Sequence, residues 1–307
     1  MPPASAMSHL MKGLQTMNVR TKPQSQTYTD LGFEVNPLSE LMAAEVVGLD
    51  LSQPFDDATR EAVYDAFVTY HVLAFRDQQL TKAQQVAFSE QFGPLERHTL
   101  SNRGADAFPM VHVVSNLNAD GVPSGKLGSR EWHTDKSFRP APSMATILHG
   151  IELPPSGGDT CFANMYAAYE ALPDAEQAEL DGLRVVHSWV LSRANLGRTM
   201  SEEEKRDAPD TSHPLVRTHP DTGRKCLFMG IHASYLEGMP VEEGRARIEQ
   251  LEAHATQERF VYRHQWRPGD VLMWDNRCLL HCADANFDAA RYARVLNRTC
   301  LRGTPTA

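Results

Sequence analysis

The sequence predicts a mainly β fold with flanking helices, arranged as a jelly roll of two packed sheets. Short apolar segments separated by turn residues recur along most of the chain, which is typical of sandwiches and barrels. Helical periodicity is confined to a few segments between them. Apolar residues make up 41% of the 307 residues and charged residues 22%, which is enough for the core of one large domain.

Composition also narrows the possible partners. The net charge of -9 argues against nucleic acid and against anionic membrane surfaces. No run of about 20 apolar residues is present, so the sequence predicts no membrane-spanning helix. The five cysteines form no Cys-x-x-Cys motif, which indicates reduced, mostly buried thiols in a cytoplasmic protein. We also expect a homo-oligomer.

Residues 1–28 are predicted to be a flexible N-terminal extension, and residues 29–307 a single domain. The first 29 residues hold no acidic residue and no apolar core of a secretory signal. An organelle transit peptide and a start codon assigned too early are the alternatives.

Up to residue 94 the pattern predicts strands and helices in turn. Thr81, followed three positions later by Gln84, is a capping pair for the second helix, which Gly93 and Pro94 end. The expected strands are 32–35, 44–50 and 72–75, and the expected helices are 57–69 and 81–92.

From residue 99 to residue 130 the chain is polar and irregular around one strand at 111–114. A long loop directly before a candidate site is often a lid, and an ordinary surface loop is the alternative. Beyond residue 145, short strands are interrupted by two expected helices, near 167–179 and 242–256. The polar stretch 191–211 is expected to be a mobile insertion.

His133 and Asp135 are the first indication of chemistry. In an extended segment, side chains two positions apart lie on one face, so this imidazole and carboxylate would share a space while Thr134 points away. Two histidines and one carboxylate, with open positions opposite, are the ligand set of non-heme Fe(II) oxygenases. The chain has thirteen histidines, so a His-x-Asp pair can also arise by chance.

His281 is the candidate for the missing ligand. It follows two leucines in a core-like strand, where a buried imidazole needs a partner. A core histidine bonded to a backbone carbonyl is the alternative. Zinc bound by Cys278, His281 and Cys282 is disfavoured, because neighbouring residues of a strand point to opposite faces.

Two arginines on one strand indicate an anion. Arg294 and Arg298 share a face of the strand expected over 292–301, where they are either solvated or paired with anions. Gly157 and Gly158 predict a tight turn with close backbone approach, just before Thr160. Each of these features is generic when taken alone.

Together these motifs resemble the taurine dioxygenase and dichlorophenoxyacetate dioxygenase family, which uses Fe(II) and 2-oxoglutarate. The resemblance covers residues 30 to 303 or so, and it implies a double-stranded β-helix, a form of the jelly roll. It rests on motifs in a fixed order, namely Trp132–Asp135, Pro154–Thr160, His213–His219, Gly269–Arg277, His281 and the pair Arg294 and Arg298.

By this resemblance the cofactor and cosubstrates are Fe(II), 2-oxoglutarate and O2. His133, Asp135 and His281 are expected to bind the iron. Thr160 and Arg294 are expected to bind the far carboxylate of 2-oxoglutarate.

The spacing between His281 and Arg294 is slightly longer than the family's usual spacing. Arg291 is therefore the fallback for Arg294, although it has the wrong strand phase. Arg298 is expected to bind the anionic end of the substrate or to assist the cosubstrate. His98 matches a substrate-binding histidine of the taurine branch, and His232 either adds a hydrogen bond to the substrate or is structural.

The segment Phe228–Ser234 resembles the phenoxyacetate branch, and Ala233 within it leaves room for a ring. Ser129 stands where the taurine branch has an asparagine, which argues against taurine. The expected substrate is a small organic anion, an aryloxyalkanoate, in a pathway of aromatic compound catabolism. Hydroxylation beside the ether oxygen would yield a phenol and a 2-oxo acid, with release of succinate and CO2. An alkyl sulfonate or sulfate ester is the alternative substrate, and a catalytically inactive binding protein or a zinc-dependent hydrolase is the alternative class.

Overall fold

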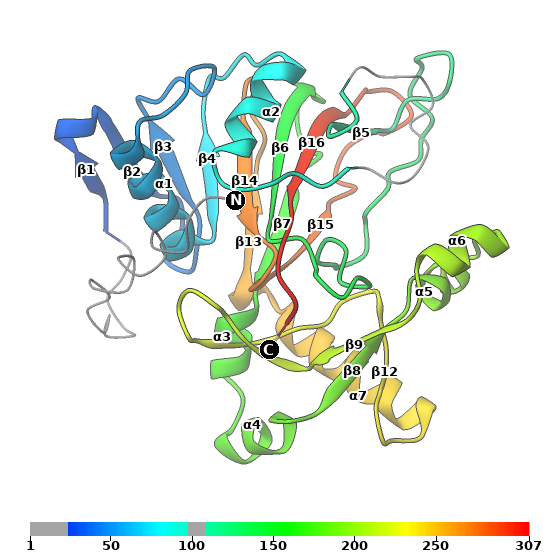
Figure 1. The fold of residues 1–307 in the computed structure, drawn as a ribbon. Coiled ribbons are helices and arrows are strands. Elements are labelled where there is room, and N and C mark those ends of the chain that lie inside the picture. The colour runs from blue at the N-terminus through cyan, green and yellow to red at the C-terminus, as the bar shows by residue number, and fades with distance from the viewer. Residues whose placement is uncertain (1–23, 98–107, 307) are drawn as a thin grey trace, which may run out of the picture.

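The computed structural model describes residues 24–97 and 108–306. Strands dominate this part of the chain and form a jelly roll, a double-stranded β-helix, as the sequence predicts (Figure 1). Neighbours in the larger sheet are antiparallel apart from its third and fourth strands. This sheet has the order β1 (Gln26–Tyr28), β2 (Phe33–Pro37), β3 (Ala44–Val47), β4 (Val72–Phe75), β14 (Val271–Asp275), β6 (Ala145–Glu152), β16 (Val295–Leu301) and β5 (His112–Ser115).

A smaller antiparallel sheet of three strands packs against the larger one. Its order is β13 (Val261–His264), β7 (Thr160–Asn164) and β15 (Leu279–Ala283). Trp274 of the larger sheet meets Phe162 of the smaller sheet edge to face, with ring centroids 5.4 Å apart. Both side chains are fully buried, and burial of a large apolar side chain contributes about 1.5–3 kcal/mol. This contact lies in the core between the two sheets.

Two helices cover the other face of the larger sheet, α1 (Asp57–Tyr70) and α2 (Lys82–Glu90) (Figure 1). Phe67 of α1 and Phe88 of α2 belong to a second core cluster with Val271 and Met273 of β14. Strand β14 is therefore buried on both faces. The expected capping box at the start of α2 is present.

The remaining elements lie below the two sheets and to their lower right in Figure 1. They form a three-stranded sheet in the order β12-β8-β9 and a two-stranded sheet of β10 and β11, with five helices around them. In chain order they are α3 (Met165–Glu170), α4 (Asp174–Leu180), β8 (Arg184–His187), α5 (Trp189–Asn195), α6 (Glu202–Asp207), β9 (Thr211–Pro214), β10 (Val216–Thr218), β11 (Lys225–Leu227), β12 (Ala233–Leu236) and α7 (Val241–Ala255). Single 3-10 turns occur at Thr29–Leu31 and Glu258–Phe260.

Two stretches of this region differ in secondary structure from the sequence expectations. The single helix expected over 167–179 is two helices, because Pro173 cannot continue α3 and instead precedes the first residue of α4. The stretch 191–211, expected to be a mobile insertion, contains most of α5 and all of α6. Ser201 and Glu204 form a capping box at the start of α6, which is the local signal for this helix.

The ordered domain also begins earlier in the chain than expected. Residues 26–28, expected to belong to the flexible extension, form β1 and pair with β2. Tyr28 stacks on Phe33 with ring centroids 4.6 Å apart. The rest of that expectation, residues 1–23, lies outside the described residues. Within the two described ranges, no helix has the length and apolar character needed to cross a membrane.

Candidate active site

His133, Asp135 and His281 meet at one end of a cavity between the two sheets, and His133 and His281 line this cavity. His133 and His281 form an isolated antiparallel bridge and exchange two backbone hydrogen bonds, of 3.0 and 2.8 Å. The Nε2 atom of each histidine lies 3.9 Å from one oxygen of the Asp135 carboxylate. One possible ligand atom from each residue falls within 4.8 Å of the other two. The structure thus brings together the three residues that the sequence singles out.

The local backbone differs from the expected extended segment. Only His133 pairs in strand fashion, and Asp135 already belongs to a turn. The two side chains nevertheless converge, and Thr134 turns away to donate a hydrogen bond to the Asn276 carbonyl at 2.7 Å. The spacing argument therefore predicts the side-chain directions correctly, although the segment is not a strand.

The charge states at this cluster favour a bound cation. Burial lowers the pKa of His133 and takes that of His281 well below its ordinary value, so both imidazoles are neutral. Burial alone would raise the pKa of Asp135, but the Arg298 guanidinium and the two imidazoles hold it below its usual range. His133 Nδ1 donates to the Glu131 carbonyl at 2.9 Å, which leaves its Nε2 as an acceptor. Nitrogen and oxygen atoms 3.9 Å apart are too distant for hydrogen bonds, and the set fits a divalent metal ion.

At the other end of the same cavity, Arg294 and Thr160 form a buried polar pair. Arg294 Nη2 donates to Thr160 Oγ1 at 3.2 Å, and its Nε donates to the Gly158 carbonyl at 2.8 Å. Arg294 is only 3% exposed, and burial lowers its pKa to about 10, against an opposing effect of Asp159. Within residues 24–97 and 108–306 it forms no salt bridge. A buried guanidinium without a carboxylate partner suits an anionic group of a ligand.

The cavity that joins these two ends opens to solvent. Val114, Leu148 and Trp274 form apolar parts of its wall, and Arg298 also lines it. The cavity thus combines one metal-binding end, one cationic end and an apolar wall between them, as small-molecule sites commonly do.

The turn at Gly157 and Gly158 can only be built with glycine. Both residues have positive φ, of +74° and +70°. A Cβ atom at position 157 would lie 2.2 Å from the Asn286 carbonyl oxygen, and one at 158 would lie 2.9 Å from Pro154 Cγ. The predicted tight turn with close approach is therefore confirmed, and it presents the Gly158 carbonyl to Arg294.

Arg298 has an anionic partner within the protein. Its Nη1 donates to Asp135 Oδ1 at 3.2 Å, and its Nη2 lies 3.1 Å from His112 Nδ1. Arg294 and Arg298 both line the cavity, as their shared strand phase predicts. Asp135 is thus an anionic partner of Arg298 inside the protein. Arg291 is exposed, so Arg294 holds the inward position.

His232 lies in a small aromatic cluster. The Ser192 hydroxyl donates its one proton to the Trp189 carbonyl at 2.8 Å. His232 Nδ1 lies 2.8 Å from the Ser192 hydroxyl oxygen and must therefore be the donor in that hydrogen bond. The His232 ring meets Phe138 edge to face, with centroids 5.0 Å apart. Burial lowers the pKa of His232 to about 3, so the ring is neutral and its Nε2 is an acceptor. His98 lies outside the described residues.

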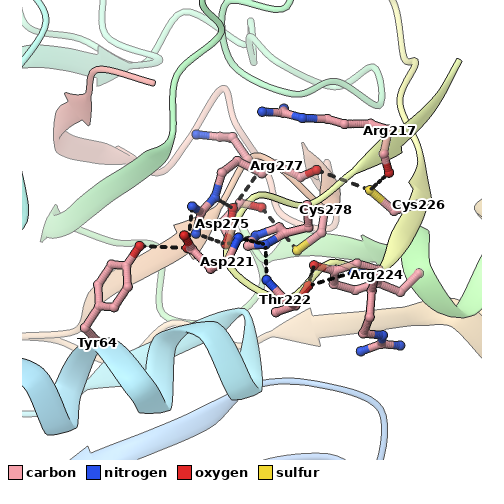
Figure 2. A network of polar contacts seen from close by, with 12 residues as sticks. Tyr64, Arg217, Asp221, Thr222, Arg224, Cys226, Asp275, Arg277 and Cys278 are labelled. Atoms are coloured by element: carbon pink, nitrogen blue, oxygen red, sulfur yellow. Dashed lines mark hydrogen bonds and ion pairs between the residues drawn. The ribbon is translucent and has the colours of Figure 1, made fainter. Parts of the chain in front are cut away.

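Figure 2 shows a charge network that anchors the turn between β14 and β15. Arg277 donates to both oxygens of Asp275, at 2.8 and 2.7 Å, and His219 Nε2 lies 3.0 Å from Asp275 Oδ2. Arg277 Nη1 also donates to Asp221 at 2.6 Å, and Tyr64 donates to the same oxygen at 2.8 Å. Asp275 therefore ends strand β14 and binds an arginine.

Cys278 with His219 and Asp275 forms a second group within metal-ligand distance. Two facts make it unsuited to a cation. Arg277 already supplies the positive charge next to Asp275. Burial raises the pKa of Cys278 well above its usual value, which keeps the thiol protonated.

The alternative zinc site of Cys278, His281 and Cys282 is not formed. Cys282 is the cross-strand partner of Cys161 on β7, whereas His281 pairs with Phe162 and points to the opposite face. The expected alternation along the strand is the reason.

Three residues that support the cluster were missed by sequence reasoning. Thr146 donates to Asp135 Oδ2 at 2.6 Å, and Asn276 donates to Thr146 at 2.9 Å. His112 contacts Arg298. A polar residue inside the apolar strand 145–152 was the one local signal for Thr146. Asn276 lies in the turn after β14 and His112 on β5, and tertiary contacts set the partners of both.

The loop expected to be a lid is described only in part, because residues 98–107 lie outside the described residues. Its later part is tied to another loop, since Asn116 Nδ2 and Gly125 N donate to the Ala289 carbonyl at 2.9 and 3.1 Å. Gly128 and Ser129 line the cavity. Closure of this loop on substrate stays a prediction.

Comparison with known proteins agrees with this geometry. The family described as "Taurine catabolism dioxygenase TauD, TfdA family" matches residues 34–300. The alpha-ketoglutarate-dependent 2,4-dichlorophenoxyacetate dioxygenase of Cupriavidus pinatubonensis is 43% identical over 258 residues, which cover 80% of this chain and 90% of that protein. The alpha-ketoglutarate-dependent sulfate ester dioxygenase of Pseudomonas putida is 32% identical over 286 residues, which cover 89% of this chain and 90% of that protein. The crystal structure of AAD-2 in complex with Mn(II) and N-oxalylglycine matches with a TM-score of 0.79 and 37% identity, over 90% of this chain and 98% of that chain.

Proposed function

Because the chain belongs to the TauD/TfdA family of dioxygenases, we propose that it hydroxylates an aryloxyalkanoate at the carbon beside the ether oxygen. The protein is an Fe(II)- and 2-oxoglutarate-dependent dioxygenase of a small molecule. When bound, Fe(II) and 2-oxoglutarate supply the oxidising chemistry, which consumes O2 and releases succinate and CO2. The hydroxylated aryloxyalkanoate collapses to a phenol and a 2-oxo acid, which is a step of aromatic compound catabolism.

We assign iron binding to His133, Asp135 and His281. Two neutral imidazoles and one carboxylate would hold the metal ion and leave its other positions for reactants. The Glu131 carbonyl and the Thr146 hydroxyl hold the His133 ring and the Asp135 carboxylate in place. These contacts orient the ligand atoms before any metal arrives.

The observation that carries the proposal is the buried Arg294, which lines the same cavity as His133 and His281. A 2-oxo diacid has one end that chelates a metal and one distal carboxylate. We assign the distal carboxylate to Arg294 and Thr160. The guanidinium is already oriented by the Gly158 carbonyl, so it binds an anion without first losing a protein partner of opposite charge.

We assign Arg298, His232 and His98 to the substrate side of the site. Arg298 lines the cavity and places positive charge beside Asp135. His232 presents an acceptor nitrogen, so it suits a hydrogen-bond donor and not the substrate's anionic group. The assignment of His98 rests on the resemblance alone.

A sulfate ester or alkyl sulfonate is the second candidate substrate. The Pseudomonas putida relative is a sulfate ester dioxygenase, and its match covers 89% of this chain. Both candidates are small organic anions, so the cationic cavity suits either.

The two candidates separate in one assay. The enzyme is supplied with Fe(II), ascorbate and 2-oxoglutarate, and phenol release from 2,4-dichlorophenoxyacetate is measured beside succinate formation with an alkyl sulfate. Phenol and succinate released in equal amounts support the aryloxyalkanoate. Turnover with the alkyl sulfate alone would replace the substrate class and leave the enzyme class intact.

We also propose that the protein is cytoplasmic and forms a homo-oligomer. All five cysteines are free, which fits a reducing compartment. Light scattering on the purified protein measures its mass in solution, and a mass of one chain would overturn the oligomer.

A further inference from the structure

Cys161 and Cys282 lie directly opposite each other on the outer side of the smaller sheet. They are register partners of β7 and β15. His281 exchanges both of its backbone hydrogen bonds with His133, so the next residue, Cys282, directs its own bonds toward β7. Opposed residues of this hydrogen-bonded kind have Cα atoms about 5.5 Å apart. Disulfides commonly join Cα atoms about 5.5–6 Å apart.

The two thiols interact, and a cation stands beside them. A side-chain hydrogen bond from Cys282 lowers the pKa of Cys161, and the nearby Arg263 lowers it further, against the effect of burial. Arg263 is the register partner of Cys161 on β13, and it pairs with Asp284. A cysteine beside a guanidinium has more of its reactive thiolate form.

The other three cysteines differ from this pair. Burial raises the pKa of Cys226 to about 12, that of Cys300 to about 11, and that of Cys278 well above its ordinary value. The Cys226 thiol donates to the Arg277 carbonyl at 3.3 Å. These three residues therefore act as internal controls for thiol reactivity.

We propose that Cys161 and Cys282 form a reversible disulfide when the enzyme meets hydrogen peroxide. The Cys161 sulfur attacks one peroxide oxygen and the O–O bond breaks, so Cys161 becomes a sulfenic acid and the other oxygen leaves as water. The Cys282 sulfur then attacks the sulfenic sulfur, the S–O bond breaks, and a second water leaves with the Cys282 proton. Two thiols are oxidised and one peroxide is reduced to two waters. Cys161 is 4% exposed and Cys282 is 8% exposed, so a molecule as small as peroxide can reach the pair.

The disulfide affects both ends of the active site. Its Cβ atoms need to be about 3.8 Å apart, whereas opposed strand residues hold them about 4.5–5.5 Å apart, so β7 and β15 must draw together. Thr160 precedes Cys161, and His281 precedes Cys282. Closure of the strands therefore displaces one residue from the cationic end and one from the metal-binding end. A disulfide made under this strain is easily reduced, so the change is reversible.

The test uses purified full-length protein with iron chelated, so that peroxide reacts with thiols alone. After peroxide treatment, alkylation and digestion without reductant, mass spectrometry should find a peptide pair linked through Cys161 and Cys282. Cys226, Cys278 and Cys300 should be alkylated. When peroxide is removed and Fe(II), ascorbate and 2-oxoglutarate are supplied, most of the turnover should be lost, and dithiothreitol should restore it.

Matched variants complete the experiment. Cys161→Ser and Cys282→Ser should each keep their turnover after peroxide, and Cys300→Ser should still form the linked pair and lose activity. No linked pair in the wild type, or a disulfide among the other three cysteines, overturns the proposal. An equal activity loss in Cys161→Ser overturns the link to catalysis. The linked peptide is found independently of the substrate, so its absence cannot be confused with a wrong substrate class.

Discussion

Replacement of Arg294 by alanine is expected to raise the 2-oxoglutarate concentration needed for turnover by about 30-fold to about 4,000-fold. The range follows from the burial of this side chain. Arg294 is 3% exposed and forms no salt bridge within the described ranges, so a ligand carboxylate would be its anionic partner. Removal of one member of a buried, hydrogen-bonded charge pair costs about 2–5 kcal/mol, and each 1.4 kcal/mol is about a tenfold change. The 2-oxoglutarate requirement of Arg294→Lys should fall between those of the wild type and Arg294→Ala. An ammonium group keeps the charge but cannot bind both carboxylate oxygens as a fork.

The measurement is the rate of succinate formation as a function of 2-oxoglutarate concentration. Arg291→Ala is the matched control, since it removes the same charge from an exposed position three residues away. Arg294 also donates to Gly158 and Thr160, so the melting temperature of each variant is needed to exclude partial unfolding. An unchanged cosubstrate requirement in a folded Arg294→Ala protein, or an equal rise in Arg291→Ala, would refute the reasoning.

Three further predictions concern the metal, the glycine turn and pH. Alanine at His133, Asp135 or His281 should abolish binding of Mn(II), measured by calorimetry. The control His254→Ala, on α7, should keep this binding. Binding of Mn(II) that survives each of the three changes contradicts the assignment. Gly158→Ala should lower the free energy of unfolding by about 1–3 kcal/mol, since its Cβ would lie 2.9 Å from Pro154 Cγ. Gly223 has a φ of +69° but open space around it, so Gly223→Ala should lose less free energy of unfolding in urea than Gly158→Ala. Equal losses in the two variants would contradict the role of the close approach to Pro154. Burial lowers the pKa of His71 from 6.5 to about 3, so the unfolded chain binds a proton that the folded protein excludes. The stability from neutral His71 is fully present above pH 6.5 and falls by up to about 1.4 kcal/mol per pH unit as the pH drops toward 3. His71→Asn, which tolerates the φ of +65°, should flatten this slope in urea titrations at pH 7 to 4, and an identical slope would rule the residue out.

Local features of the sequence were sufficient to predict several elements. The capping pair Thr81 and Gln84 places the start of α2, and the apolar run 72–75 coincides with β4. Both depend on interactions within a few residues, so periodicity and caps suffice. The order of motifs along the chain identified the family, the jelly roll and the oxygenase chemistry. It also selected His133, Asp135 and His281 for the metal and Arg294 with Thr160 for the cosubstrate, and the structure places each set together.

Tertiary structure alone decided the partners across strands. Arg298 was predicted to face the cavity, but its partners were not predicted. The pairing of β16 with β5 brings His112 to the Arg298 guanidinium, and the approach of β16 to the metal cluster brings Asp135 to it. The opposition of Cys161 and Cys282 likewise depends on the register of β7 with β15, and a slip of one residue would turn the two side chains to opposite faces. Contacts of this kind join residues more than a hundred positions apart. Their geometry is set by the packing of whole sheets, which no short stretch of sequence encodes.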